Sequence, residues 1–263
     1  MSTPYVEAPS LTQPPIIAAA MLQTQAAGVA SDAIVLDHFL DSISLYKHDA
    51  RALEKAFGWS TLTYQFFKLR SAPDFVNRLF GCHALTERFG DRLSWPAGFY
   101  VEPTDTSVED ELDDFGELPA ESLRFNSPRH GLLVRVCRVV TRGIQVYRHP
   151  KDERPRWITS AGLDGGRSQI ASIHVQGSLL GKQTGKAFLV ANSLEAYAVA
   201  LKYRQCAVAL NGVSLRTLLA QLFEALPALG GLVVAMKEPP PNLMRELSAM
   251  GLAVNFFKGG DLL

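Results

Sequence analysis

The segment KAFLVANSLEAYAVALKYRQCAVALNGVS, residues 186–214, joins two short apolar runs through a longer stretch of helical character. The runs AFLVA and CAVAL have the length of strands, and LEAYAVALKY between them repeats apolar residues at helical spacing. Ser193 is expected to cap that helix, because a serine side chain can accept a hydrogen bond from a free N–H group of the first turn. Continuous apolar strands linked by helices predict a parallel sheet covered on both faces.

The same alternation continues toward the end of the chain. After the turn NGVS the sequence predicts a helix, a strand, a second helix and a last strand, which are LRTLLAQLFEAL, GLVVAM, NLMRELSAM and LAVNFF. Gly251 is expected to end the second of these helices. The fold class is therefore α/β, and residues 186–263 are expected to form a parallel sheet with helices on both faces. Ligands bind such sheets at the carboxyl ends of the strands, which here carry Ala191-Asn192-Ser193, Asn211-Gly212 and Lys237-Glu238-Pro239.

Three further regions precede this sheet. Residues 1–30 contain four prolines and are expected to form a flexible arm. Residues 31–122 are predicted to be mainly helical and to end in an acidic loop, and residues 123–185 to be basic and rich in strands. The helical signals are an apolar repeat over Ser31–Phe57, Gly58 as its stop, Ser60 as the cap of a following helix, and a further helix over residues 74–90. Together these regions predict a mixed α+β accessory domain with a helical N-terminus.

The acidic loop holds eight Asp or Glu residues and no Lys or Arg between Asp105 and Glu121. It is interpreted either as a solvated loop or as a surface for a basic partner. No second cluster of potential metal ligands is predicted to face these carboxylates, which argues against a metal site.

Residues 123–186 have the opposite charge, with twelve Lys or Arg against three Asp or Glu. The runs GLLVRVCRVV and GIQVYRH predict a sheet with one buried face and one charged face. Basic side chains interleaved with an aromatic ring suit a nucleic-acid backbone and an unstacked base, and the alternative is a solvated face balanced by the acidic loop. The nucleic-acid-binding candidates are Arg135, Arg138, Arg142, Arg148, Arg154, Arg156, Trp157, Lys182, Lys186 and Lys237.

Composition narrows the class of protein. The formal net charge is zero, so overall charge favours neither nucleic acid nor a membrane as partner. The three cysteines form no C-x-x-C pair and indicate neither a zinc ribbon nor a disulfide framework, so a cytoplasmic protein is expected. No apolar stretch has the length and flanks of a signal peptide or membrane span, and no membrane partner is expected.

The segment from Lys186 onward resembles a Toprim domain, the α/β unit of primases, primase-helicases and topoisomerases. The matching pieces, in order, are LVANSLEA, AVALNGVS, VVAMKEP and KGGDLL. The preceding region is similar to the accessory region of primase-like proteins of mobile genetic elements, of plasmid, phage or integrative type. Its matching pieces are LSWPAGFY, RHGLLVRVCRV, GIQVYRHP and RPRWITSAGLDGGRSQIASIHV.

The resemblance implies a degenerate site. In that family a glutamate and a glycine follow the first strand, and two aspartates that hold a divalent cation end the third. Mg²⁺ sites need carboxylate oxygens, and alanine, asparagine, lysine and proline stand at these positions here, so no metal, cofactor or catalytic residue is expected. The degenerate positions and the carboxylates near them are Ala191, Asn192, Glu195, Lys237, Glu238, Pro239 and Asp261.

Three functions follow from these patterns. The first is a catalytically inactive primase-like protein that binds nucleic acid, or a nucleic-acid-processing complex, as an accessory or inhibitory factor. Its partner in trans would be a helicase, nuclease or replication protein. The second is a protein-interaction module that docks a host or phage protein through the acidic loop. The third is a divergent nucleotidyl transferase or nuclease that binds Mg²⁺ through Glu195, Glu238 and Asp261. The first is favoured because the expected metal ligands are replaced.

Overall fold

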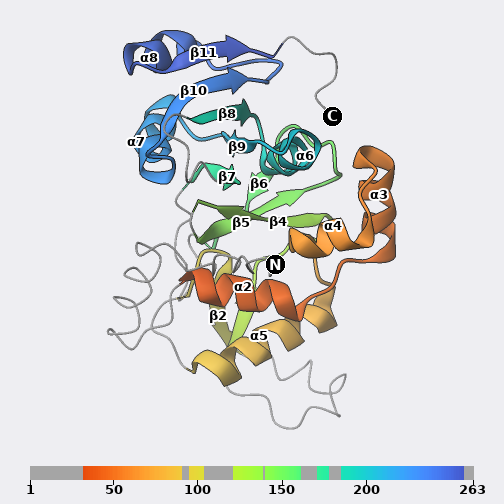
Figure 1. Ribbon diagram of the computed structural model, residues 1–263. Coiled ribbons are helices and arrows are strands. Elements are labelled where there is room, and N and C mark those ends of the chain that lie inside the picture. The colour runs from red at the N-terminus through yellow and green to blue at the C-terminus, as the bar shows by residue number, and fades with distance from the viewer. Residues whose placement is uncertain are drawn as a thin grey trace, which may run out of the picture. The chain divides into compact units, whose positions relative to one another are not determined.

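A computed structural model of the 263-residue chain (Figure 1) describes residues 32–90, 95–103, 121–138, 140–160, 171–177 and 185–257. Four predicted features lie outside the described residues: the flexible arm, the acidic loop up to residue 120, Lys182 and Asp261. Glu121, the last residue of the acidic loop, is described. No helix in these described segments has both the length and the apolar character needed to cross a membrane.

The C-terminal part of the chain builds a sheet of five strands in the order β11-β10-β8-β9-β7. β8 lies at its centre and pairs in parallel with β9 and β10, and β10 pairs in parallel with β11. β7, which the sequence did not predict, adds one antiparallel edge. The strand bounds are β7 His174–Gln176, β8 Gly185–Val190, β9 Cys206–Ala209, β10 Leu229–Val234 and β11 Ala253–Phe256.

Helices cover both faces of this sheet because successive side chains of a strand point to opposite sides. Leu189 packs in one cluster with α7 (Leu215–Ala225) and α8 (Leu243–Ala249). Val190 packs on the other face with α6 (Ser193–Tyr203). Both side chains are fully buried, and each burial of this kind contributes about 1.5–3 kcal/mol.

Two of these helices begin at side-chain caps. The Ser214 hydroxyl accepts a hydrogen bond from Thr217 N at 3.1 Å, so α7 begins where the sequence predicts. The prediction that Ser193 caps α6 is wrong by one residue. The cap is Asn192, whose Oδ1 accepts from Glu195 N at 3.1 Å, while Ser193 is buried within the first turn and its hydroxyl bonds to Asn211.

The described chain between residues 32 and 90 is largely helical, and the apolar repeat over Ser31–Phe57 forms two helices. Arg70 Nε donates to Leu40 O at 2.6 Å at the end of the first helix, and Ser71 Oγ accepts from Tyr46 N at 2.8 Å before the second begins. These partners are distant in sequence, so periodicity alone could not reveal the break. Gly58 ends the second helix in a left-handed conformation, as predicted. The bounds are α2 Asp32–Ser42, α3 Lys47–Phe57, α4 Thr61–Phe66 and α5 Phe75–Phe89.

A second sheet has the order β1-β4-β5-β6 and is antiparallel throughout. Val134 on one face of β4 packs with Leu194 and Tyr197 of α6. Arg135 on the other face is half-buried against α2. The predicted open, charged face is therefore wrong for β4, because α2 covers it. The bounds are β1 Arg70–Ser71, β4 Leu132–Cys137, β5 Thr141–Tyr147 and β6 Arg156–Trp157.

A pair of antiparallel strands, β2 (Phe99–Pro103) and β3 (Glu121–Phe125), completes the described elements. Phe39 of α2 meets Phe99 and Phe125 at ring-centroid distances of 5.0 and 4.3 Å. This aromatic group anchors α2 to the strand pair.

The two larger sheets are joined through α6 and β7. The Tyr197 ring of α6 stacks on Phe67 at 4.1 Å, and its hydroxyl donates to Arg135 O at 3.2 Å. Cys137 N at the end of β4 donates to Nδ1 of the buried His174 on β7 at 3.0 Å. These contacts place β4 beside α6 and β7.

Candidate functional site at the carboxyl edge of the parallel sheet

Between β8 and β10, at the carboxyl edge of the sheet, the connecting helices switch from one face of the sheet to the other. β8 leads into α6 on one face, whereas β10 leads into α8 on the opposite face. Such a switch point is the place at which open α/β sheets bind ligands. Ala191 and Asn192 follow β8, Lys237 follows β10, and Ala235 N donates to Leu189 O at 2.9 Å between them. The structure thus brings the two halves of the expected degenerate site to one edge.

Glu195 is engaged with the start of α6. Its Oε2 accepts from Ala191 N at 2.9 Å, and its Oε1 accepts from the Asn192 side chain at 3.0 Å. Asn192 in turn accepts from Glu195 N, so the two side chains bond reciprocally as in a capping box, except that Glu195 reaches the N–H of Ala191, the residue before the cap. Burial raises the pKa of Glu195, and the hydrogen bonds from Ala191 and Asn192 act in the opposite direction. A surviving carboxylate of the expected site therefore holds the helix end.

Tyr147 fills the space at the same helix end from the other sheet. Its hydroxyl accepts from Ser193 N at 3.0 Å and donates to Gln145 Oε1 at 3.3 Å. Burial raises the pKa of Tyr147, which stays neutral. The first turn of a helix is a natural anion site because its N–H groups and dipole favour negative charge. Here a phenol hydroxyl from β5 occupies that position.

Asn211 connects the edge to the second sheet. Its φ of 55°, followed by a φ of 73° at Gly212, makes the turn that the NG pair predicts. Asn211 O accepts from Trp157 Nε1 at 3.3 Å and from the Gln145 amide at 3.5 Å. Trp157 is half-buried by this contact, so its indole helps to fix β6 against the parallel sheet.

Lys237 stands where the resemblance expects the first aspartate. Its Nζ lies 3.2 Å from Oε1 of Glu153, and both side chains are largely exposed, at 85% and 74%. Glu153 belongs to the connection between β5 and β6, so this connection reaches the end of β10. Glu238 is exposed and Pro239 is half-buried beside it.

A metal ion needs several His, Cys, Asp or Glu side chains close together. Across the described residues, no group of three or more His, Cys, Asp or Glu side chains lies close enough to hold an ion. Asp261 lies beyond the described segments. Glu195 and Glu238 therefore belong to no such group among the described residues.

The connection between β5 and β6, residues 148–155, and the first residue of β6, Arg156, carry exposed positive charge; we call residues 148–156 the basic hairpin. Asp152 braces it, because its two carboxylate oxygens accept from Arg148 N and Arg154 N, each at 3.0 Å. Within the described segments, no carboxylate lies in ion-pair range of its four basic side chains. They are exposed and comprise Arg148, Lys151, Arg154 and Arg156.

The other predicted basic candidates lie elsewhere. Arg138 is half-buried in an ion pair with Glu224 of α7 at 2.6 Å. Arg142 is exposed on β5, and Arg138 and Glu224 both influence its pKa, which burial lowers. Lys186 is exposed near the start of β8, away from the carboxyl edge.

Sequence reasoning missed Tyr147, Gln145, Asp152 and Glu153. Tyr147 and Gln145 look like ordinary residues of an alternating strand, and no local signal assigns them to a helix end in another sheet. Asp152 could have been found from the turn-forming segment HPKDERP, because Asp side chains often bond to backbone N–H groups two residues away.

Comparison with known proteins identifies the fold. No family model matches the chain, and no curated protein matches it. In structure it is similar to a crystal structure of the Aquifex aeolicus primase that contains the zinc-binding and RNA polymerase domains, with a TM-score of 0.52 and 17% sequence identity. The match covers 91% of this chain, and the chain spans 60% of the length of the primase chain. This likeness shows a primase-like fold.

Proposed function

We propose, on the premise of a primase-like fold, that this protein binds nucleic acid through the basic hairpin as a catalytically inactive accessory or inhibitory factor. The observation that carries the proposal is that the basic hairpin has four exposed basic side chains and reaches Lys237, at the carboxyl edge, through Glu153. A helicase, nuclease or replication protein would act with it in trans. The assignment to a mobile genetic element rests on the sequence resemblance alone.

Electrostatics supports the choice of ligand. Lys and Arg side chains bind phosphates of the nucleic-acid backbone and release counterions, which makes such binding depend steeply on salt. A lysine at the cation position opposes a metal, since two unit charges about 4 Å apart repel by about 4 kcal/mol at an effective dielectric constant of about 20. The same ammonium group attracts a phosphate oxygen.

The absence of catalysis is proposed from how the carboxylates are used. Glu195 bonds to Ala191 N and the Asn192 side chain, so its oxygens serve the α6 end. Metal-assisted phosphoryl transfer needs carboxylates that hold one or two cations at the reacting phosphate. Lys237 and Pro239 cannot supply them, and the proposal therefore includes no cofactor.

Binding is tested by fluorescence anisotropy with labelled single-stranded and double-stranded DNA over a series of salt concentrations. In the variant Arg154→Glu/Arg156→Glu we expect about a tenfold or greater loss of affinity at low salt, and a salt dependence weaker by about two phosphate contacts. The matched control is Arg51→Glu/Lys55→Glu, which makes the same charge change on exposed residues of α3. Equal losses in both variants, or no DNA binding by the natural chain at low salt, would refute the proposal.

Inactivity is tested separately by calorimetric titration with Mg²⁺ and Mn²⁺ and by nucleotide incorporation on a single-stranded template. We expect neither saturable submillimolar binding nor product. Saturable binding that is lost in Asp261→Ala would instead establish a rearranged metal site, and product formation would establish an active enzyme.

A further inference from the structure

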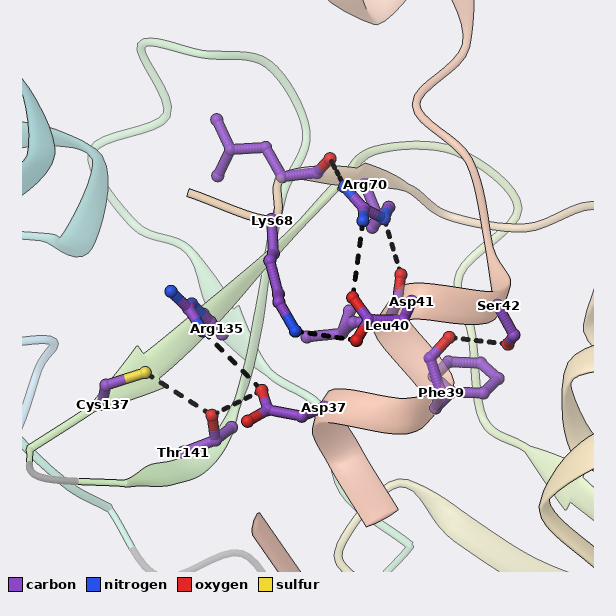
Figure 2. Close-up of polar contacts among 11 residues, drawn as sticks. Asp37, Phe39, Leu40, Asp41, Ser42, Lys68, Arg70, Arg135, Cys137 and Thr141 are labelled. Atoms are coloured by element: carbon purple, nitrogen blue, oxygen red, sulfur yellow. Dashed lines mark hydrogen bonds and ion pairs between the residues drawn. The ribbon is translucent and has the colours of Figure 1, made fainter. Parts of the chain in front are cut away.

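A second group of cations lies on the opposite face of the β4–β5 sheet from the parallel sheet. Lys68 lies in the turn between α4 and β1, Arg70 belongs to β1, and Arg135 comes from β4. Figure 2 shows dashed lines from Lys68 and Arg70 to Asp41 and from Arg135 to Asp37, both of which lie on α2. We call Lys68, Arg70 and Arg135 the α2 cation cluster.

The two carboxylates neutralise this cluster incompletely. Asp41 is shared: its Oδ2 lies 2.7 Å from Lys68 Nζ, and its Oδ1 lies 3.8 Å from Arg70 Nη2. Asp37 Oδ1 already accepts from the Thr141 hydroxyl at 2.8 Å, and its distance to Arg135 Nη1 is 3.8 Å. Three positive charges thus meet two negative ones, and both arginine ion pairs are longer than a hydrogen bond.

Arg70 and Arg135 differ in how many of their hydrogen-bond donors already have partners within the protein. Arg70 donates to Leu40 O and Leu69 O at 2.6 and 3.0 Å, so it is committed to the end of α2. Burial lowers the pKa of Arg70, and the nearby positive charge of Arg135 lowers it further, against the effect of Asp41. Arg135 Nε is buried and has no hydrogen-bond partner among the described residues, although 24% of the side chain remains exposed.

We propose that the α2 cation cluster binds a phosphate group, with Arg135 and Lys68 as its contacts, while Arg70 stays bonded to the end of α2. A guanidinium group offers several donors in a planar fork that matches a phosphate, and such bonds are roughly twice as strong as neutral ones. A phosphate would supply the missing negative charge and could take Lys68 from Asp41. This site is separate from the basic hairpin and does not depend on the proposed function.

The phosphate could belong to a free compound or to a nucleic-acid strand, and two probes separate these sources. Calorimetry with inorganic pyrophosphate tests the free compound, and anisotropy with single-stranded DNA tests the strand. Both are applied to Arg135→Gln and Lys68→Gln, with Lys55→Gln on α3 as the control for the loss of one exposed positive charge. We expect the first two variants to weaken binding of at least one probe about fivefold or more, and the control to change it less than twofold.

A variant that gains affinity serves as a further test, because misfolding can weaken binding but does not strengthen it. Asp41→Asn removes the carboxylate that competes for Lys68, and 49% of the Asp41 side chain is exposed. It should bind the same probe about threefold more tightly.

The outcomes identify the ligand. If the variants Arg135→Gln and Lys68→Gln lose pyrophosphate binding, the ligand is a free phosphate compound, and if they lose DNA binding alone, it is a nucleic-acid strand. Unchanged affinity for both probes in Arg135→Gln and Lys68→Gln, or no gain in Asp41→Asn, overturns the proposal. Repetition in the Arg154→Glu/Arg156→Glu background distinguishes this site from the hairpin, because the cluster effects should persist there.

Discussion

The corner where β8 meets α6 and the basic hairpin beside it use polar side chains in opposite ways. At the corner, Tyr147 and Asn192 are buried and bond to backbone N–H groups of the helix end. On the hairpin, Arg154 and Arg156 are exposed, and no carboxylate of the described segments is in ion-pair range of either. The first turn of α6, where an anion would be expected, is thus filled by the protein's own groups. Exposed positive charge lies instead on the nearby basic hairpin.

The largest effect is expected from acid, which should lower the free energy of unfolding through the buried His174 of β7. Burial lowers the pKa of His174 from 6.5 to about 3, with a smaller contribution from Arg135 in the same direction. Below pH 6.5 the unfolded chain therefore binds a proton that the folded chain does not, so the free energy of unfolding is unaffected above pH 6.5 and falls as the pH drops toward 3. The loss is about 1.4 kcal/mol per pH unit, or about 2.7 kcal/mol between pH 6.5 and 4.5.

Urea unfolding across this pH range measures the effect. The control is His174→Asn, whose side-chain oxygen can still accept from Cys137 N but does not titrate. A variant that loses as much stability in acid as the natural chain would show that His174 is not the source.

The next largest effect is expected at the α6 end. Tyr147→Phe keeps the ring and removes the hydroxyl, which leaves Ser193 N without its acceptor. We expect the free energy of unfolding to fall by about 1–3 kcal/mol. Tyr64→Phe is the matched control, because the Tyr64 hydroxyl bonds to Thr61 at the exposed surface. Similar losses in the two variants would mean that Tyr147 contributes through its ring alone.

The cap of α6 gives a smaller effect. Asn192→Ala removes the acceptor for Glu195 N and should lower the free energy of unfolding by about 1 kcal/mol. Ser60 occupies the same position before α4 but makes no side-chain cap hydrogen bond, so Ser60→Ala should cost less than half as much. Thermal and urea unfolding of the two variants provide the comparison, and an equal cost would contradict the assigned cap.

The hairpin should give the smallest effect on folding. Arg154→Gln is expected to change the free energy of unfolding by less than about 0.5 kcal/mol, since exposed charges contribute little. Its affinity for DNA should nevertheless fall severalfold, with a salt dependence weaker by about one contact. Parallel measurements of unfolding and of Kd test this separation, and a variant that loses stability without losing affinity would reverse the comparison.

Much of the C-terminal fold could be predicted because its signals are local. Continuous apolar runs such as CAVAL and the start of α7 after the turn NGVS follow from properties of neighbouring residues. The break between α2 and α3 could not be predicted in this way, since it depends on Arg70 and Ser71 from β1. The candidate site shows the same division: the replaced positions Ala191 and Lys237 are visible in the sequence, whereas their neighbours across the edge are not.

The sequence by itself determined the order of strands and helices from Lys186 to Phe257, and which residue types stand at the end of each strand, because both depend on short-range pattern. Only the tertiary structure decided what those residues do. Side chains brought together from separate sheets commit Glu195 and Tyr147 to the α6 end, cover Arg135 with α2 and leave the basic hairpin exposed. The physical reason is that burial and ion pairing depend on what packs against a side chain, and periodicity along the chain does not contain that information.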